Sequence, residues 1–81
     1  MILITEEPYV RVDWYITHPN AASSVTIESD PGNGSTKEAT MSFTFNSEFE
    51  TGKYVITAQI VYGLNRAESL SYVLDVQDYH F

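Results

Sequence analysis

Apolar and polar residues alternate with a period of two along most of this chain, and this alternation limits the possible folds more than any other feature. Successive side chains of a β-strand point to opposite faces, so an alternating segment indicates a strand with one buried face. The alternating segments are residues 10–17, 24–28, 38–45, 53–62 and 69–76, and a shorter strand is expected at Ile2–Thr5. Apolar residues at helical spacing with caps are absent, so essentially no helix is expected.

Turn-forming residues separate these segments. They are His18-Pro19-Asn20, Asp30-Pro31-Gly32-Asn33-Gly34, the polar stretch 46–50 and Gly63-Leu64-Asn65-Arg66. Proline cannot donate to a ladder, while glycine and asparagine tolerate positive φ. The connections are too short for crossovers between parallel strands, so antiparallel order is expected. The sequence therefore predicts an all-β, antiparallel sandwich or small barrel of six or seven strands.

Length and charge indicate a single domain and argue against several classes of partner. The 81 residues, 43% of them hydrophobic, supply one core, so 1–81 is expected to be one domain. Residues 1–9 would form an N-terminal edge strand or arm, and residues 77–81 a loose C-terminal end. A formal net charge of −7 argues against nucleic acid and anionic membrane surfaces as partners. No segment approaches the roughly 20 apolar residues that span a bilayer, so no membrane insertion is expected.

The segment Glu50-Thr51-Gly52-Lys53-Tyr54-Val55-Ile56 resembles the corner that opens strand F of immunoglobulin-like domains. The resemblance implies an immunoglobulin-like β-sandwich in which Tyr54 is the corner tyrosine, with its ring in the core and its hydroxyl bonded to backbone upstream. Ile56 would occupy the position where that family often has cysteine. Trp14 would be the core tryptophan of strand C. Residues 49–76 also resemble the closing hairpin of polycystic-kidney-disease-type (PKD-type) domains.

Two features depart from that family. Trp14 is followed by Tyr15-Ile16-Thr17 instead of an Asp-rich and Gly-rich loop, and only thirteen residues precede Trp14, where the family fits two strands. Either the first strand is missing, or Met1–Thr5 is the sole N-terminal strand. An incomplete sandwich leaves an open edge, which must be protected or paired. Such an edge predicts a partner protein bound by edge-strand addition.

The sequence gives no catalytic residues and no cofactor. Nucleophilic catalysis needs a base beside the nucleophile, and the two histidines, His18 and His80, stand in a turn and next to the C-terminus. Cysteine is absent, which excludes thiolate metal sites and disulfides. Calcium is the one metal with candidate ligands, Glu28 and Asp30, beside a turn that offers carbonyl oxygens. The alternative is that Asp30 caps that turn.

Aromatic residues at outward or terminal positions are the candidates for a binding surface. They are Tyr9, Tyr15, Tyr79 and Phe81. Surface tyrosine brings contact area at low entropic cost, so it is favoured in binding patches, although a second sheet or a neighbouring domain could equally cover these rings.

The function expected from these features is a non-catalytic module for protein–protein assembly or surface display. Its partner would be a capsid protein, a surface protein or a neighbouring domain. The expected setting is a phage virion or the bacterial cell surface. The alternative is a carbohydrate-binding or accessory domain of a secreted enzyme, which predicts a planar row of exposed aromatic rings.

Overall fold

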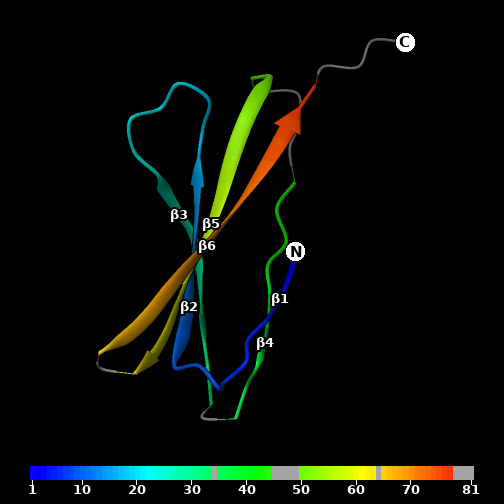
Figure 1. Cartoon of the computed structure of the whole chain (residues 1–81). Helices are drawn as coiled ribbons and strands as arrows, with labels where there is room; N and C mark the ends of the chain where they lie inside the picture. The colour runs from blue at the N-terminus through cyan, green and yellow to red at the C-terminus, as the bar shows by residue number, and fades with distance from the viewer. Residues whose placement is uncertain (34, 45–49, 64, 78–81) are drawn as a thin grey trace.

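Two antiparallel β-sheets pack against each other in a computed structural model that describes residues 1–33, 35–44, 50–63 and 65–77 (Figure 1). The strands are β1 (Ile2–Ile4), β2 (Arg11–Thr17), β3 (Val25–Pro31), β4 (Glu38–Thr40), β5 (Gly52–Gly63) and β6 (Arg66–Val76). None of the described residues is helical, and no helix among them could cross a membrane. The prediction of an all-β antiparallel sandwich of six or seven strands is confirmed, with six strands in the described part of the chain.

The two sheets differ greatly in size. The larger sheet has the order β3-β2-β5-β6, and the smaller sheet contains β1 and β4. β5 and β6 form the longest hairpin, with Gly52 opposite Val76 and Val61 opposite Ala67. β1 and β4 contribute only three residues each. Two short strands therefore have to cover the inner face of four strands, two of which exceed ten residues.

The core lies between the sheets, where β2 and β5 meet the smaller sheet. Alternate residues of β2 and β5 point inward because of the strand period. The buried apolar residues are Leu3, Tyr9, Val12, Trp14, Ile16, Ala39, Met41, Tyr54, Ile56, Ala58 and Ile60. Trp14 and Tyr54 are the largest of its completely buried side chains.

The alternation fails at the residues that precede β2. Val10 was expected to point inward, but its side chain is 52% exposed. The expected outward position of Tyr9 is also wrong, because Tyr9 is buried and its hydroxyl donates to the Glu38 carbonyl at 2.9 Å. The backbone of Val10 donates to Val61 and accepts from Gly32. Val10 thus bridges two neighbouring segments, and the regular alternation begins only at Arg11.

β4 is shorter than the strand expected at 38–45. It ends at Thr40, although Met41 still exchanges backbone hydrogen bonds with Met1. A strand extends only as far as its partner supplies hydrogen bonds, and the three-residue β1 supplies few. Met41 is buried and Phe43 packs partly against the core, while Phe45 lies outside the described residues.

Candidate functional site

The free edge of β6 is the longest unpaired strand edge in the described chain. β5 pairs with one edge of β6, and no described strand pairs with the other. β6 contains no proline and no lysine, and its ladder to β5 runs without a register shift from Ala67 to Val76. Natural sheets protect their edges with such residues or with bulges, since an open edge can pair with another strand.

The hydrogen-bonding groups on that free edge can be assigned from the register. The Val61 carbonyl accepts from the Val10 amide, so the backbone of Val61 points toward β2 and that of Ile60 toward β6. Ile60 lies opposite Glu68. Backbone groups alternate in direction along a strand, so even-numbered residues of β6 bond to β5. The outward-directed amides and carbonyls belong to Ala67, Ser69, Ser71, Val73 and Asp75.

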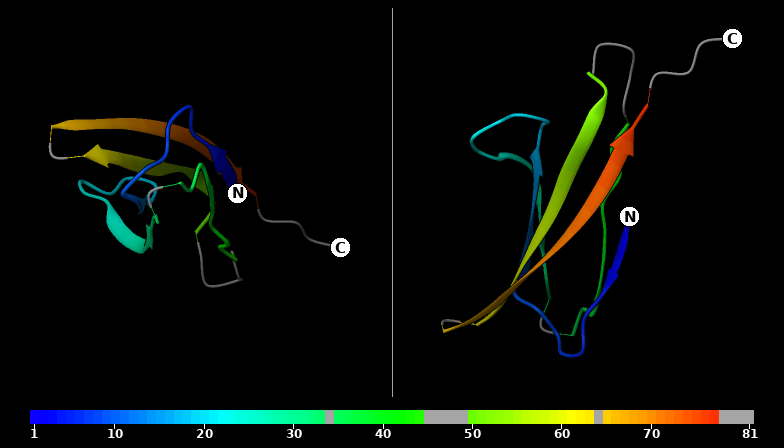
Figure 2. Two further views of the ribbon diagram at one scale, coloured as in Figure 1. Left: turned by 90° about the horizontal axis from the view of Figure 1, so that it is seen from below. Right: turned by 45° about the horizontal axis from the view of Figure 1, so that its top comes forward.

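Apolar side chains gather along the side of the sandwich where β1 and β6 lie, and we call these two strands the open side. Figure 2 (left) shows β1 on the same side of the molecule as β6, with β4 farther along toward β3. On the inner face of β6, Leu70 is 39% exposed and Tyr72 is 37% exposed. Other exposed apolar residues of the open side are Met1, Ile2, Ile4 and Val73. The smaller sheet does not reach far enough to cover Leu70 and Tyr72, whereas Ile2, Ile4 and Val73 are exposed because they point away from the core.

An apolar hollow of about 270 Å³ opens on this side. It is lined by Met1, Met41, Phe43, Ile56 and Leu74, so it lies between the start of the smaller sheet and the inner face of β5 and β6. Such a hollow suits apolar side chains. None of these lining residues has a charged or polar side chain that could orient a small polar ligand.

The opposite end of the open side is closed by charged residues. Arg66, at the start of β6, forms an ion pair with Glu7, which follows β1. The Arg66 guanidinium also lies 5.3 Å from the ring centre of Tyr62, whose hydroxyl donates to Glu68. The hydrogen bond from Arg66 lowers the pKa of Glu7, and the hydrogen bond to Glu68 raises the pKa of Tyr62 to about 12. Both pairs are exposed, so they orient this end more than they stabilise it.

The other side of the sandwich has a protected edge. β3 ends in Pro31 and has a register irregularity against β2 at Trp14/Tyr15. Proline and irregularities both discourage strand addition. Charge does not distinguish the two edges, because β3 carries Glu28 and Asp30 while β6 carries Glu68 and Asp75. The contrast between the two edges of one sheet identifies β6 as the edge that is open for pairing.

The calcium candidates, Glu28 and Asp30, both lie on β3. Glu28 lies opposite Trp14 and Asp30 opposite Val12 in the β2–β3 ladder. Among the described residues, no group of three or more His, Asp or Glu side chains is placed to hold a metal ion. In the neighbouring turn, the Asn33 side-chain oxygen accepts hydrogen bonds from Ser35 and Thr36. That oxygen therefore organises the turn.

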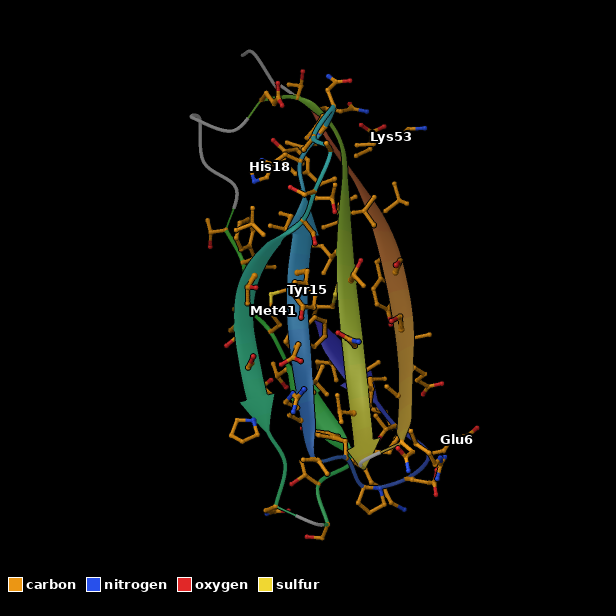
Figure 3. The ribbon with its side chains drawn as sticks, turned by 90° about the vertical axis from the view of Figure 1, so that its left-hand side faces the viewer. Glu6, Tyr15, His18, Met41 and Lys53 are labelled. Carbon is orange, nitrogen blue, oxygen red and sulfur yellow. The ribbon has the colours of Figure 1, made fainter. Side chains whose placement is uncertain are left out.

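The expected aromatic surface is not assembled from the described residues. Tyr9 is buried, and burial raises the pKa of its hydroxyl. Tyr15 is half-buried in the middle of β2, and His18 lies beyond the end of that strand (Figure 3). Tyr79, Phe81 and His80 lie outside the described residues. Sequence reasoning missed Leu70 and Tyr72 as surface residues because their alternation assigns them to the inner face, and only the shortness of β1 and β4 leaves them uncovered.

The corner at the start of β5 is closely packed. The buried Tyr54 hydroxyl donates to the Glu50 carbonyl at 2.6 Å, and its ring meets His18 edge-to-face at 5.2 Å. Gly52 has a φ of 137°, and a Cβ atom there would lie 2.9 Å from Pro19. These contacts join the β2–β3 connection to β5 at the end of the sandwich that lies away from the β5–β6 turn.

Comparisons with protein-family models, curated proteins and solved structures each found no match.

Proposed function

We propose that this protein is a non-catalytic assembly module that binds another protein by strand addition to β6. The observation that carries the proposal is the unprotected edge of β6, with outward-directed backbone groups on Ala67–Asp75 and an exposed apolar row beside it. Main-chain hydrogen bonds give affinity in strand addition, and alternate side chains give specificity. The apolar hollow between Met1 and Leu74 gives the added strand a place to bury a side chain.

We further infer that the module is immunoglobulin-like. Such domains place strands C′, C, F and G in one sheet and strands B and E side by side in the other. β3-β2-β5-β6 and β1-β4 follow the same two orders if strands A and D are absent. The bond from Tyr54 to the backbone four residues upstream supports this assignment, because the family's tyrosine corner makes the same kind of bond. None of the described strands lies beside β1 in the place of strand A, and this leaves the open side uncovered.

A protein partner fits these features better than a carbohydrate. The carbohydrate alternative needs a planar row of exposed rings, and Tyr9, one of its expected members, is in the core. The setting that we propose is a virion or a cell surface, where the partner is a capsid protein, a surface protein or a neighbouring domain.

The experiment compares capture by two proline variants. Ser71→Pro removes an outward-directed amide of β6 without removing a backbone bond to β5, although it also loses the exposed hydroxyl contact with Thr57. Thr26→Pro is the corresponding change on the opposite edge strand, β3. Wild type and the two variants are immobilised separately, and each is exposed to a particle or surface-protein preparation of the source. We expect Ser71→Pro alone to lose the bound protein. Hydrogen exchange then locates the contact, with slowed exchange expected at Ala67–Asp75.

Equal retention by all three proteins would contradict strand addition at β6, as would slowed exchange confined to β3. Circular dichroism of each variant shows beforehand that it is folded.

A further inference from the structure

We infer that the strand added to β6 is β6 of a second copy, so that two molecules pair through this edge as a symmetric antiparallel dimer. The inference rests on the proposed function, because it names the partner of the same edge. The pairing would join the two four-stranded sheets into one continuous sheet. Symmetric dimers are the commonest oligomers, and such an interface must be self-complementary.

The register of β6 meets that requirement. When the full strand pairs with its own copy, Arg66 lies opposite Val76 of the second copy, and Ser71 lies opposite Ser71 at the two-fold axis. A two-fold axis perpendicular to the sheet places the inner faces of the two copies on the same side. Each odd-numbered residue of β6 therefore pairs with an odd-numbered residue of the second copy. These are the residues whose amides and carbonyls point outward. The register that uses the whole strand is therefore also one that pairs the free backbone groups.

The side chains of this register are complementary. On the inner face, Leu70 lies opposite Tyr72 of the second copy, and both side chains are more than one-third exposed in the single molecule. Aromatic and aliphatic residues that face each other across strands stabilise a sheet. The charged residues of β6 face uncharged ones: Arg66 faces Val76, Glu68 faces Leu74 and Asp75 faces Ala67. No like charges are opposed.

Charge and area set the strength of this dimer. β6 is roughly 37 Å long at about 3.4 Å per residue, so an edge contact about 10 Å thick buries roughly 800 Å² in total. That area lies at the low end for specific interfaces, so a weak and reversible dimer is expected. Each copy has a net charge of −7, so the copies repel at low salt although residues 69–73 are uncharged. Salt screens that repulsion and tightens the dimer.

Sedimentation equilibrium between about 1 µM and 1 mM measures the association. We expect wild type to dimerise and to associate more tightly at 0.5 M salt than at 0.05 M salt. Ser71→Asp places two carboxylates opposite each other at the axis, and Ser71→Lys places two ammonium groups there. Each variant alone is expected to associate at least about ten-fold more weakly, because opposed like charges destabilise a strand pair. Mixing the two variants is expected to restore a one-to-one dimer.

Thr26→Asp is the matched control, since it adds the same charge on the exposed β3 edge and should dimerise like wild type. A wild type that stays monomeric at 1 mM and high salt overturns the inference, and so does a Ser71→Asp protein that dimerises normally. If wild type is monomeric but binds another protein in a way that Ser71→Pro abolishes, the proposed function stands and only the identity of the partner fails. If neither association occurs, both fail.

Discussion

Tyr54 connects three parts of the chain through one side chain. Its ring is fully buried, it contacts the His18 ring edge-to-face, and its hydroxyl bonds to the Glu50 carbonyl. An aromatic ring supplies a large buried area, and a buried hydroxyl must find a partner. The residue therefore fixes the β2–β3 connection and the start of β5 relative to the core.

We predict that Tyr54→Phe folds but melts at a temperature lower by about 4–8 °C. The substitution keeps the ring and removes the hydroxyl, which donates to the Glu50 carbonyl. The Glu50 carbonyl is near the surface and can turn to water, which limits the loss. Tyr15→Phe is the control, because Tyr15 is half-buried on the outer face. This variant should melt within a degree or two of wild type. Equal shifts in the two variants would contradict the role of the corner hydrogen bond.

A second residue-scale feature fixes the register between β2 and β3. Asp13 lies opposite Ser29, whose hydroxyl donates to the Asp13 carboxylate at 2.7 Å, while Arg11 donates at 3.1 Å. These hydrogen bonds lower the pKa of Asp13, and the bond from Ser29 has the largest effect. A carboxyl whose pKa is lower in the folded state stabilises the protein above its unfolded pKa, and this contribution disappears as pH falls through the folded pKa.

Ser29→Ala is expected to lower the free energy of unfolding at pH 7 by about 1 kcal/mol, since it removes one partly exposed hydrogen bond to a charged group. The difference from wild type should shrink between pH 4 and pH 2, because protonated Asp13 no longer needs that donor. Urea denaturation at pH 7 and at pH 2.5 measures both values. A pH-independent difference would mean that Ser29 acts by packing and not through the Asp13 charge.

At the scale of elements, Gly32 allows the chain after β3 to pass close to the segment before β2. Its amide donates to the Val10 carbonyl at 2.7 Å, and a Cβ atom at Gly32 would lie 1.9 Å from the Tyr9 carbonyl oxygen. The two atoms that this Cβ atom would meet within 3 Å are the carbonyl oxygen and carbonyl carbon of Tyr9. Both belong to the backbone, so no side-chain rotation can relieve the collision. The position thus requires glycine because of a close approach, independently of its φ.

Gly32→Ala is predicted to destabilise the fold by about 1–3 kcal/mol, as overpacking in a close contact does. Gly63→Ala is the matched control, because a Cβ atom there meets nothing within 4 Å. Its stability should be unchanged or higher by up to about 1 kcal/mol, through a less flexible unfolded chain. Thermal unfolding of the two variants side by side tests this contrast. Two variants of equal stability would show that the Tyr9 backbone yields easily.

The elements that sequence reasoning placed well are those with long, regular alternation. β5 was expected at 53–62 and is Gly52–Gly63, because its inner row is apolar throughout. Reasoning failed where tertiary contacts override alternation, as at Tyr9, and where strand length depends on a distant partner, as at β4. The open side itself was expected as an incomplete sandwich. Its location on β6 depends on how little of the larger sheet β1 and β4 cover, which alternation alone does not encode.

At the scale of the whole molecule, the sandwich is asymmetric. Only β2 and β5 are well covered on their inner face, while β6 carries exposed apolar residues and an unpaired edge. A domain of this size has little stability to spare, because a small core barely exceeds the loss of conformational entropy. Pairing through β6 would cover the exposed row, so assembly and folding stability should be linked.

This link predicts that the melting temperature of wild type rises with protein concentration. Binding that involves only the folded state stabilises it by mass action, so each ten-fold increase above the dissociation constant should raise the melting temperature by about 3–5 °C. Ser71→Asp, which opposes two carboxylates at the dimer axis, should begin this rise only at a concentration at least about ten-fold higher. Thr26→Asp should follow wild type. Differential scanning calorimetry from about 10 µM to 1 mM makes the measurement. A wild-type melting temperature that is constant over this range would mean that β6 does not pair with a second copy. The apolar row of β6 would then stay exposed, and the stability of the single sandwich would have to offset that exposure alone.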